Sequence, residues 1–527
     1  MEKECKESES TSSHHTMTPG SSKKQILNQE RLSHLPEEIL HKIFSFLDMK
    51  EVIETSIFSK RYRYSWNSVH TLNFDLSLWK KHLTSPSDLN RFIPFVYHVL
   101  SLRRSGGANN IQKLSITCSD SFEGTHFNNW IDIAIHRHVQ EIEIYVHSDQ
   151  EFEVNPSIFT SEVKIFKLRA DLNSSAWFSR PIKLPLQMCL AEHLNTLELV
   201  SVALPKGDEV TMNCPVLENL IIRKSYQAPL KSFTICAVQL KKLNIDNSFI
   251  TRRLYIRCEK LVRLKYIGSM SAVSLLENLN AVINAEICVA LNTRKMKEEA
   301  ANAKKVIAAM PNAKCLVFKG LEVFLKIPNS LDSLLIPLRY LRNLKLLPSS
   351  RDRACIYGMA HVLKGCPLLE KLAWESVESS RITDGGVYTS FPSEFVLSRL
   401  KIVKAHVVQG RVDELEFLTF LLENAPGLRK MTIDTDTNGQ IVHVDEFEFL
   451  TFLLKNAVGL RNMTIDTCTG QISGEREELQ KFKFKADLVA FLFNRPHTIV
   501  SSLNLYNNSG GIRQIWRTEF HFPTCDG

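Results

Sequence analysis

The sequence predicts a chain of the α/β class, with a small helical segment near its start and a long stack of parallel strands behind it. Two observations predict the stack. A short phrase of the form leucine-x-x-leucine-x-apolar recurs from residue 111 onward, and residues 413–435 agree with residues 445–467 at 19 of 23 positions. A tandem copy is tolerated where each unit stacks on its neighbours, so the repeats favour a solenoid over a closed globule.

The recurring phrases set the period of this stack. They begin at residues 111, 139, 163, 194, 217, 240, 261, 285, 313, 341, 369, 397, 428 and 460, and the steps from 285 to 397 are all 28 residues. The thirteen steps average about 27 residues, inside the range of leucine-rich repeats. We therefore expect a leucine-rich-repeat solenoid, a curved parallel sheet whose leucines face the core, with helices or loops returning on its convex side.

The helical segment spans residues 31–66. Pro36 suits the first turn of a helix, and Glu37 and Glu38 suit its positive end. Apolar residues then recur at helical spacing up to Leu47. Asp48 followed by Glu51 predicts a capping box that starts a second helix, and a third is expected from residue 59. So short a unit cannot bury a full core alone, which indicates a docking module.

The residues LPEEIL, FSFLD, TSIFSKRYRYSW and NFD of this segment resemble the F-box. The resemblance implies docking on a Skp-family adaptor and, through it, on a cullin-type ubiquitin ligase. It places the adaptor-binding positions at Leu35, Pro36, Ile39, Leu40, Ile43, Phe44, Leu47, Val52 and Trp66. Plant members often have tryptophan and leucine where this chain has Tyr62 and Ser65, so a scaffold that works without an adaptor remains an alternative.

A second resemblance covers most of the remaining chain. CPVLENL and CPLLEKL are similar to plant F-box leucine-rich-repeat proteins, and SRLKIVKA with FLLENAPGLRKMTI resembles the FBD module found in many of them. The predicted organisation is a disordered tail at 1–30, an F-box at 31–75, linker helices at 76–110 and leucine-rich repeats at 111–390. FBD-like repeats follow at 391–470, and a C-terminal cap at 471–527.

Composition narrows the class of protein further. The chain has 527 residues and a formal net charge of +8, and no apolar run reaches the roughly 18 residues of a membrane-spanning helix. Twelve cysteines without a CxxC pair predict neither a disulfide framework nor a zinc ribbon. Cys214, Cys236 and Cys258 are evenly spaced, which favours one apolar slot of the repeat. We expect no cofactor, no membrane partner, and a cytoplasmic or nuclear location or both.

The positions between the leucines predict a basic outer face. Of 42 such positions, sixteen are lysine or arginine and six are acidic. The residues singled out for target binding are Lys241, Lys242, Arg263, Lys265, Arg342, Lys345, Arg399, Lys401, Arg429 and Lys430. Such a face attracts an acidic or phosphorylated protein or an anionic ligand, or it is only a solvated surface. Nucleic acid is disfavoured because no aromatic residues interleave these positions.

Motifs for catalysis are not found. GxxxxGK[ST], HExxH and GxSxG do not occur. Asp434, Asp436, Asn438, Gly439 and Asp445 have the spacing of a calcium loop, but a strand is expected before them where that loop needs a helix. His136 and His138 have no acid or cysteine at ligand spacing.

Three functions remain open on the sequence. The first is a non-catalytic substrate receptor of a ubiquitin ligase. The second is a ligand-gated receptor of the same architecture, and the third is the adaptor-independent scaffold.

Overall fold

The computed structural model describes residues 35–55, 65–79, 86–102, 110–118, 123–147, 151–171, 182–225, 231–246, 253–277, 279–290, 294–332, 334–335, 337–349, 353–375, 387–393, 395–408, 412–435, 462–469, 499–507 and 514–521. The chain divides into two compact units. The first comprises Met1–Ser119 with Asn129–Ile144, and the second comprises Asp120–Asn128 with Tyr145–Gly527. The predicted tail at 1–30 lies outside the described residues.

The first unit begins with helices α2 (Glu37–Phe44) and α3 (Met49–Thr55). The 3-10 helix η1 (Ser65–Ser68), strand β1 (Thr71–Asp75), the 3-10 helix η2 (Leu76–Trp79) and helix α4 (Pro86–Leu102) follow. β1 pairs in parallel with β2 (Lys113–Cys118), which neighbours β3 (Glu141–His147). Helix α5 (Gly124–Ile135) and β3 cross the sequence boundary between the units. Most of the predicted third helix falls outside the described part.

Aromatic side chains fill the core of the first unit. Phe92 on α4 and Trp130 on α5 are buried with ring centroids 6.4 Å apart, and Phe74 on β1 meets Phe95 edge-on. β1 alternates buried and half-buried residues, as a strand with one face on a core does. The core of this unit therefore lies between its short sheet and its helices.

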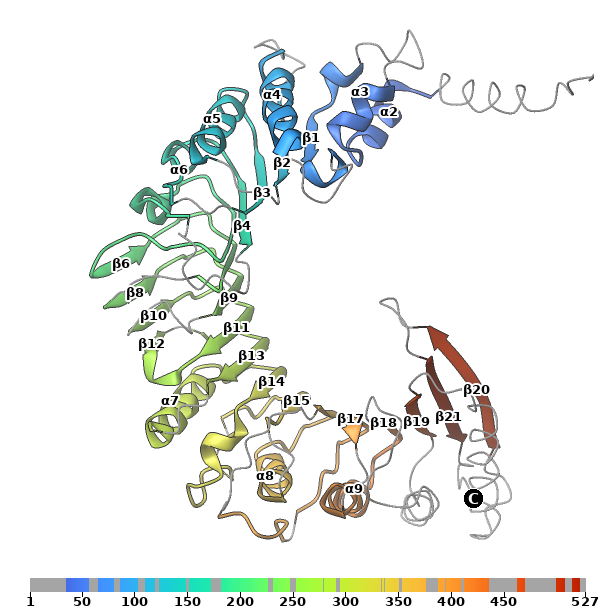
Figure 1. Ribbon diagram of the computed structural model, residues 1–527. Helices are drawn as coiled ribbons and strands as arrows, with labels where there is room; N and C mark the ends of the chain where they lie inside the picture. The colour runs from blue at the N-terminus through green and yellow to red at the C-terminus, as the bar shows by residue number, and fades with distance from the viewer. Residues whose placement is uncertain are drawn as a thin grey trace, which may run out of the picture. The chain divides into compact units, whose positions relative to one another are not determined.

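The second unit is built on a long sheet of parallel strands (Figure 1). Its members after the shared β3 are β4 (Ile165–Asp171), β5 (Thr196–Val200), β7 (Asn219–Arg223), β9 (Lys242–Asp246), β11 (Arg263–Gly268), β13 (Asn284–Val289), β14 (Cys315–Lys319), β15 (Asn343–Leu347), β16 (Lys371–Glu375), β17 (Ile402–Val408), β18 (Lys430–Thr435) and β19 (Asn462–Thr469). Equivalent leucines are neighbours, as Leu220 is opposite Leu243 and Leu243 is opposite Leu264. The predicted solenoid of parallel strands is confirmed.

Two of the fourteen predicted phrases are misplaced by three residues. Ala285 pairs with Leu264 and Leu316, so it is the second apolar position of a phrase that begins at Val282. Val403 likewise pairs with Leu372, so that phrase begins at Leu400 and not at 397. Of the four even steps of 28 residues from 285 to 397, the first and the last were therefore wrong and are 31 residues, whereas the two from 313 to 369 are confirmed. The misplacement arose because Ala285 and Leu397 are apolar residues three positions from the true start.

Behind β7 to β11 the chain forms a second sheet instead of helices. Strands β6 (Glu209–Met212), β8 (Ser232–Ile235), β10 (Leu254–Arg257) and β12 (Val273–Glu277) pair in parallel, and the chain alternates between the two sheets (Figure 1). Phe233 and Ile256 from this sheet are buried, as are Leu243 and Ile245 of β9. We call residues 209–277 the sheet-backed region.

Farther along, helices occupy the same side of the main sheet (Figure 1). They are α7 (Met296–Ala308), α8 (Arg353–Leu363) and α9 (Val412–Asn424), with the 3-10 helix η6 (Leu321–Phe324) between β14 and β15. Asp413 and Glu414 lie in the first turn of α9, where acids favour a helix start. We call residues 284–435 the helix-backed region. The expected helical return is confirmed here.

The duplicated segment stacks as a repeat should. Lys430 is opposite Asn462 and Ile433 is opposite Ile465, which are equivalent positions of the two copies. The helix expected in the second copy lies outside the described residues. β21 (Gln514–His521) then pairs antiparallel with β19, and β20 (Ile499–Asn507) pairs antiparallel with β21. These two strands cover the free edge of the parallel sheet.

The remaining sequence expectations concern thiols and metals. Cys214 and Cys258 are buried free thiols and Cys236 is a half-buried one. Within the described ranges, no group of three or more metal-ligating side chains is found, and no helix is long and apolar enough to cross a membrane. His136 is bonded through Nδ1 to the carbonyl of Asp132. Apart from Asp434, the calcium-loop residues lie outside the described part.

Candidate functional site

Asp48 fixes the turn between α2 and α3. The Asp48 N–H donates to Glu51 Oε2 (3.1 Å) and the Lys50 N–H donates to Asp48 Oδ1 (2.7 Å), which is the predicted capping box. The Asp75 N–H donates to Asp48 Oδ2 (2.6 Å), and Asn73 Nδ2 donates to the carbonyls of Ser45 and Leu47. The NFD sequence at residues 73–75 therefore clasps the helical turn from β1.

Burial raises the pKa of Asp48 to about 6, and this effect outweighs the two backbone N–H groups that lower it. Because an unfolded aspartate ionises near pH 4, the folded unit holds an extra proton between pH 4 and 6. Asp48 therefore lowers stability as the pH rises through that window. In return, the two carboxylate oxygens of Asp48 fix the turn that positions α2.

Helix α2 carries apolar residues on two neighbouring faces. Leu40 and Phe44 are buried in the unit, whereas Ile39 and Ile43 are 47% and 37% exposed. Pro36 precedes them on the exposed face, and Phe46, just beyond the helix, is 79% exposed. Pro36, Ile39, Ile43 and Phe46 recur at helical spacing and form one surface, which we call the α2 stripe. Exposed apolar surface of this kind is typical of a binding site.

The nine predicted adaptor-binding residues separate by exposure. Pro36, Ile39 and Ile43 lie on the α2 stripe. Leu35, Leu47 and Trp66 are half-buried. Leu40, Phe44 and Val52 are buried, with 5% exposure or less, so in this structure they support the surface and do not form it. Phe46 was missed, although it follows Ile43 by three residues and this spacing could have revealed it.

The second candidate site is the open face of the main sheet, which we define as the side carrying the first, third and fifth residues of each phrase strand. In β9 these are Lys242, Asn244 and Asp246, none of which is buried. None of the ten predicted target-binding residues is buried either. Arg399, however, lies in the turn before β17. It was assigned to the face because the phrase that contains it was misplaced by three residues.

Half of these ten cations are neutralised by a carboxylate of a neighbouring repeat. The pairs are Lys241 with Glu218 (2.7 Å), Lys265 with Glu286 (2.6 Å), Lys345 with Glu375 (2.7 Å), and Arg342 and Lys401 with Glu370 (3.4 and 3.9 Å). Within the described residues, no ion pair is recorded for Lys242, Arg263, Arg399, Arg429 or Lys430. The predicted basic face is therefore balanced in some places and unbalanced in others.

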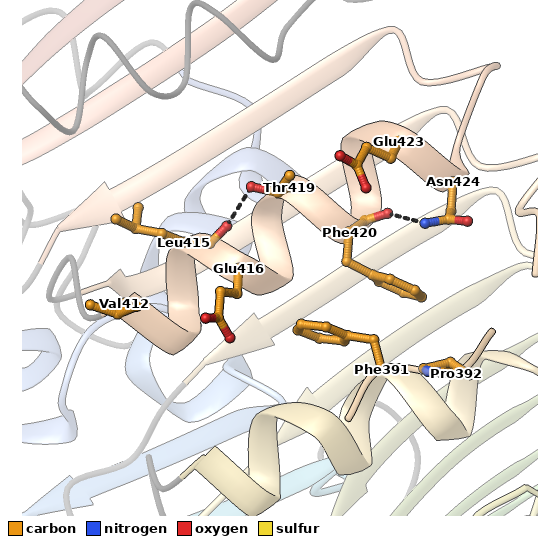
Figure 2. Close-up of a pocket in the computed structure, with 9 residues that line it drawn as sticks. All are labelled: Phe391, Pro392, Val412, Leu415, Glu416, Thr419, Phe420, Glu423 and Asn424. Carbon is orange, nitrogen blue, oxygen red and sulfur yellow. Dashed lines mark hydrogen bonds between the residues drawn. The ribbon is translucent and has the colours of Figure 1, made fainter. Parts of the chain in front are cut away.

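An apolar cavity of about 730 Å³ adjoins α9 (Figure 2). Phe391 stacks against Phe420 with ring centroids 4.9 Å apart, and Val412 and Leu415 extend the lining along the helix. Glu416, on its rim, pairs with Arg353 of α8 at 3.1 Å. This cavity was not predicted from the sequence, because Phe391 and α9 come together only in the folded chain.

Comparison with known proteins identifies two of these regions. The F-box domain model matches residues 32–73, and the FBD model matches residues 389–433. The chain carries an F-box and an FBD. The F-box match covers α2, α3 and the clasp at Asn73, and the FBD match covers Phe391, β17, α9 and most of β18. An F-box in general implies a Skp-type adaptor as partner.

Similar proteins have the same combination of domains. The chain is 26% identical to the FBD-associated F-box protein At4g10400 of Arabidopsis thaliana over 420 residues, which cover 77% of this chain and 93% of that protein. It is 26% identical to the F-box/FBD/LRR-repeat protein At5g53840 of the same plant, over 79% of this chain and 90% of that protein. F-box/LRR-repeat proteins of this kind are generally non-catalytic adaptor subunits.

Proposed function

We propose that this F-box protein is the substrate-recognition subunit of an SCF-type ubiquitin ligase. The α2 stripe docks on a Skp-family adaptor, which links to a cullin, and the repeats hold a target protein. The observation that carries the proposal is an exposed apolar stripe on the helix that the F-box model matches. The protein contributes proximity and orientation between the target and a ubiquitin-charged enzyme, and no bond chemistry of its own.

The stripe supplies part of the free energy of docking. Fully burying an Ile or Phe side chain contributes about 1.5–3 kcal/mol. Because Ile39, Ile43 and Phe46 are 47%, 37% and 79% exposed, their further burial contributes about 2–5 kcal/mol before costs. Association costs an estimated 4–15 kcal/mol, so the complex has no surplus from the stripe, and loss of two stripe residues should abolish a measurable complex.

Co-purification of the full chain with a Skp-family adaptor tests this proposal. We expect Ile39→Asp/Ile43→Asp to lose the adaptor, because two charges are placed in the docking surface. Glu54→Ala, an exposed change on α3 and outside the α2 stripe, should retain it. Circular dichroism checks that both variants are folded. Equal recovery of the adaptor with both variants, or none with the wild type, contradicts the assignment and leaves the scaffold alternative.

The ligand-gated alternative has less support. A ligand-gated receptor requires a pocket lined by arginines from several repeats. The cavity at α9 is instead lined by residues 391–392 and one helix, and its charged lining residues are Glu416 and Glu423. The adaptor-docking receptor is therefore the function that the described residues favour.

A further inference from the structure

Three unbalanced cations of the open face lie close together in the helix-backed region. Lys371 of β16 and Lys430 of β18 are the strand partners of Ile402 on β17, one on each side. Lys404 lies two residues beyond Ile402 on the same face, and all three lysines are exposed. We call Lys371, Lys404 and Lys430 the lysine triangle. Lys404 was missed by the sequence, because the misplaced phrase at 397 assigned it to no position.

We propose that the lysine triangle binds an acidic, extended segment of a partner protein. The segment places carboxylates on the three ammonium groups and an apolar side chain over Ile402. The inference rests on the proposed function, because the segment belongs to the target protein. It adds the chemistry by which that target is recognised.

The spacing of the triangle fits this ligand. Neighbouring strands lie about 4.8 Å apart and residues along a strand rise about 3.3 Å. The Cα atoms of Lys371 and Lys430 are therefore about 10 Å apart, and that of Lys404 is about 7 Å from Ile402 along the strand. Lysine side chains are long enough to converge over Ile402, which is half-buried. The Cα atom of Lys404 is about 8 Å from those of Lys371 and Lys430. A chain with acids on alternate residues places its charges about 7 Å apart, which brings them within reach of the long lysine side chains.

The balance of charge elsewhere on the open face sets this place apart. Glu198 lies between Arg169 (2.9 Å) and Arg223 (3.4 Å), and Glu286 holds Lys265. Near the lysine triangle, the acidic side chains are already paired with other residues. Glu375 is bonded to Lys345, Glu370 faces Arg342, and Asp434 is bonded to His406. Across the described residues, no ion pair is recorded for the three lysines.

This arrangement costs stability in the free protein. Like charges close together on neighbouring strands repel each other, and elsewhere an acid neutralises such charges, as Glu198 does for Arg169 and Arg223. An anionic partner would relieve the repulsion, so the triangle is electrostatically complementary to an acidic segment. Nucleic acid fits less well, because the described open-face residues of β16, β17 and β18 include no Phe, Tyr or Trp on which bases could stack.

A second, smaller pair of cations supplies a matched control. Lys242 and Arg263 are direct strand partners on β9 and β11, on the same face but in another region, and no ion pair is recorded for them among the described residues. Removing these two changes the net charge as much as removing Lys371 and Lys430. The two double variants therefore separate a local site from the general field of a basic protein.

Binding of a labelled synthetic peptide of alternating glutamate and leucine to the full chain tests the proposal by fluorescence anisotropy. We expect Lys371→Gln/Lys430→Gln to weaken binding at least tenfold and Lys404→Gln at least threefold. Lys242→Gln/Arg263→Gln should weaken it less than twofold. Equal losses in the two double variants would mean a general field and overturn the proposal.

Two further probes identify the source of the anion. The first probe is the same peptide with phosphoserine in place of glutamate. Tighter binding of this peptide, with the same dependence on the lysine triangle, supports the proposal and identifies a phosphorylated segment as the occupant. A single-stranded DNA oligonucleotide of equal charge that binds more tightly than both peptides overturns it. Adaptor co-purification should be unchanged in the triangle variants, so a failure here is distinguishable from a failure of the proposed function.

Discussion

The sheet-backed and helix-backed regions share one main sheet but differ in what lies behind it. Repeats beginning at Leu217, Leu240 and Leu261 are 23, 21 and 21 residues long, whereas the repeats that contain α7, α8 and α9, which begin at Val282, Leu341 and Leu400, are 31, 28 and 28. A four-residue strand spans about 13 Å, and helices of 11–13 residues need several residues more to return over the same core. The length of a repeat therefore selects the structure that backs it.

The two kinds of backing satisfy their backbone differently. Each strand of the second sheet bonds to the strand of the next repeat, as the Phe233 N–H donates to the carbonyl of Arg253 at 2.9 Å. A helix such as α8 satisfies its hydrogen bonds within itself. The sheet-backed repeats should therefore lose structure together, and the helix-backed repeats one at a time.

Proline substitutions should show the largest difference between the regions. We expect Thr234→Pro in β8 and Ala360→Pro in α8 each to cost about 3 kcal/mol or more, because proline removes a donor and clashes with its surroundings. Hydrogen exchange should show lost protection across β6, β8 and β10 in the first variant. In the second the loss should be confined to α8.

Matched substitutions control for the side chain alone. Thr234→Val retains the β-branched shape and should leave exchange nearly unchanged, and Ala360→Gly should cost about 1 kcal/mol without unfolding α8. If Ala360→Pro also exposes the amides of β15 and β16, the helix-backed repeats are as strongly coupled as the strands and the distinction fails.

The sequence predicted the main sheet because each phrase carries its own signal. Leu243 and Ile245 have the alternate spacing of a strand with one buried face, and the strand forms there, with Leu240 buried just before it. The second sheet was not predicted, because Ser232–Ile235 and Leu254–Arg257 are four residues long and too short for alternation to stand out. The register failed at Ala285, where a small residue occupies a leucine position.

The candidate sites were predictable in kind but not in detail. Lysines between leucines face outward by strand geometry alone, so the exposure of Lys242 and Lys430 followed from the sequence. Which lysines are neutralised depends on register between strands more than 20 residues apart, as for Lys265 and Glu286. In α2, helical spacing marked Ile39 and Leu40 equally, and only the packing of the unit shows which one is free to bind.

Alkaline pH should destabilise the sheet-backed region, which has two buried thiols, more than the end of α8, where burial raises the pKa of the Cys366 thiol to about 12. Burial raises the pKa of the Cys214 and Cys258 thiols to about 11, whereas an unfolded thiol ionises near pH 8.5. Between these values the unfolded state loses protons that the folded state keeps, so stability is full below pH 8.5 and falls as the pH rises. At pH 10 each thiol should cost about 2 kcal/mol.

Limited proteolysis with mass spectrometry at pH 8 and pH 10 measures this effect. We expect new cleavage within residues 209–257 at pH 10 before any within α8 or α9. Cys214→Ala/Cys258→Ala should remove most of the pH dependence of cleavage within residues 209–257, although it costs some packing at both pH values. Cleavage that begins in α8, or a pH dependence that survives the double substitution, would show that these thiols do not set the order.

Substitution of a glycine in α8 should have the smallest effect. It tests how closely a helix of the helix-backed region must approach the side chains packed against it. A Cβ added at Gly358 would lie 2.7 Å from Leu325 Cδ2 and 3.1 Å from Leu331 Cδ1. Overpacking costs about 1–3 kcal/mol, and alanine recovers about 1 kcal/mol of helix propensity. We expect Gly358→Ala to destabilise the chain by about 1 kcal/mol in urea unfolding.

Combination with Leu325→Ala separates the clash from other causes. The truncated leucine leaves room for the new methyl group, so Gly358→Ala should become neutral or stabilising in that background, with a coupling energy of about 1 kcal/mol or more. An unchanged cost would mean that the clash with Leu325 is not the reason for the glycine. The close approach of α8 would then not be what distinguishes the helix-backed repeats, whose length alone would have to explain their helices.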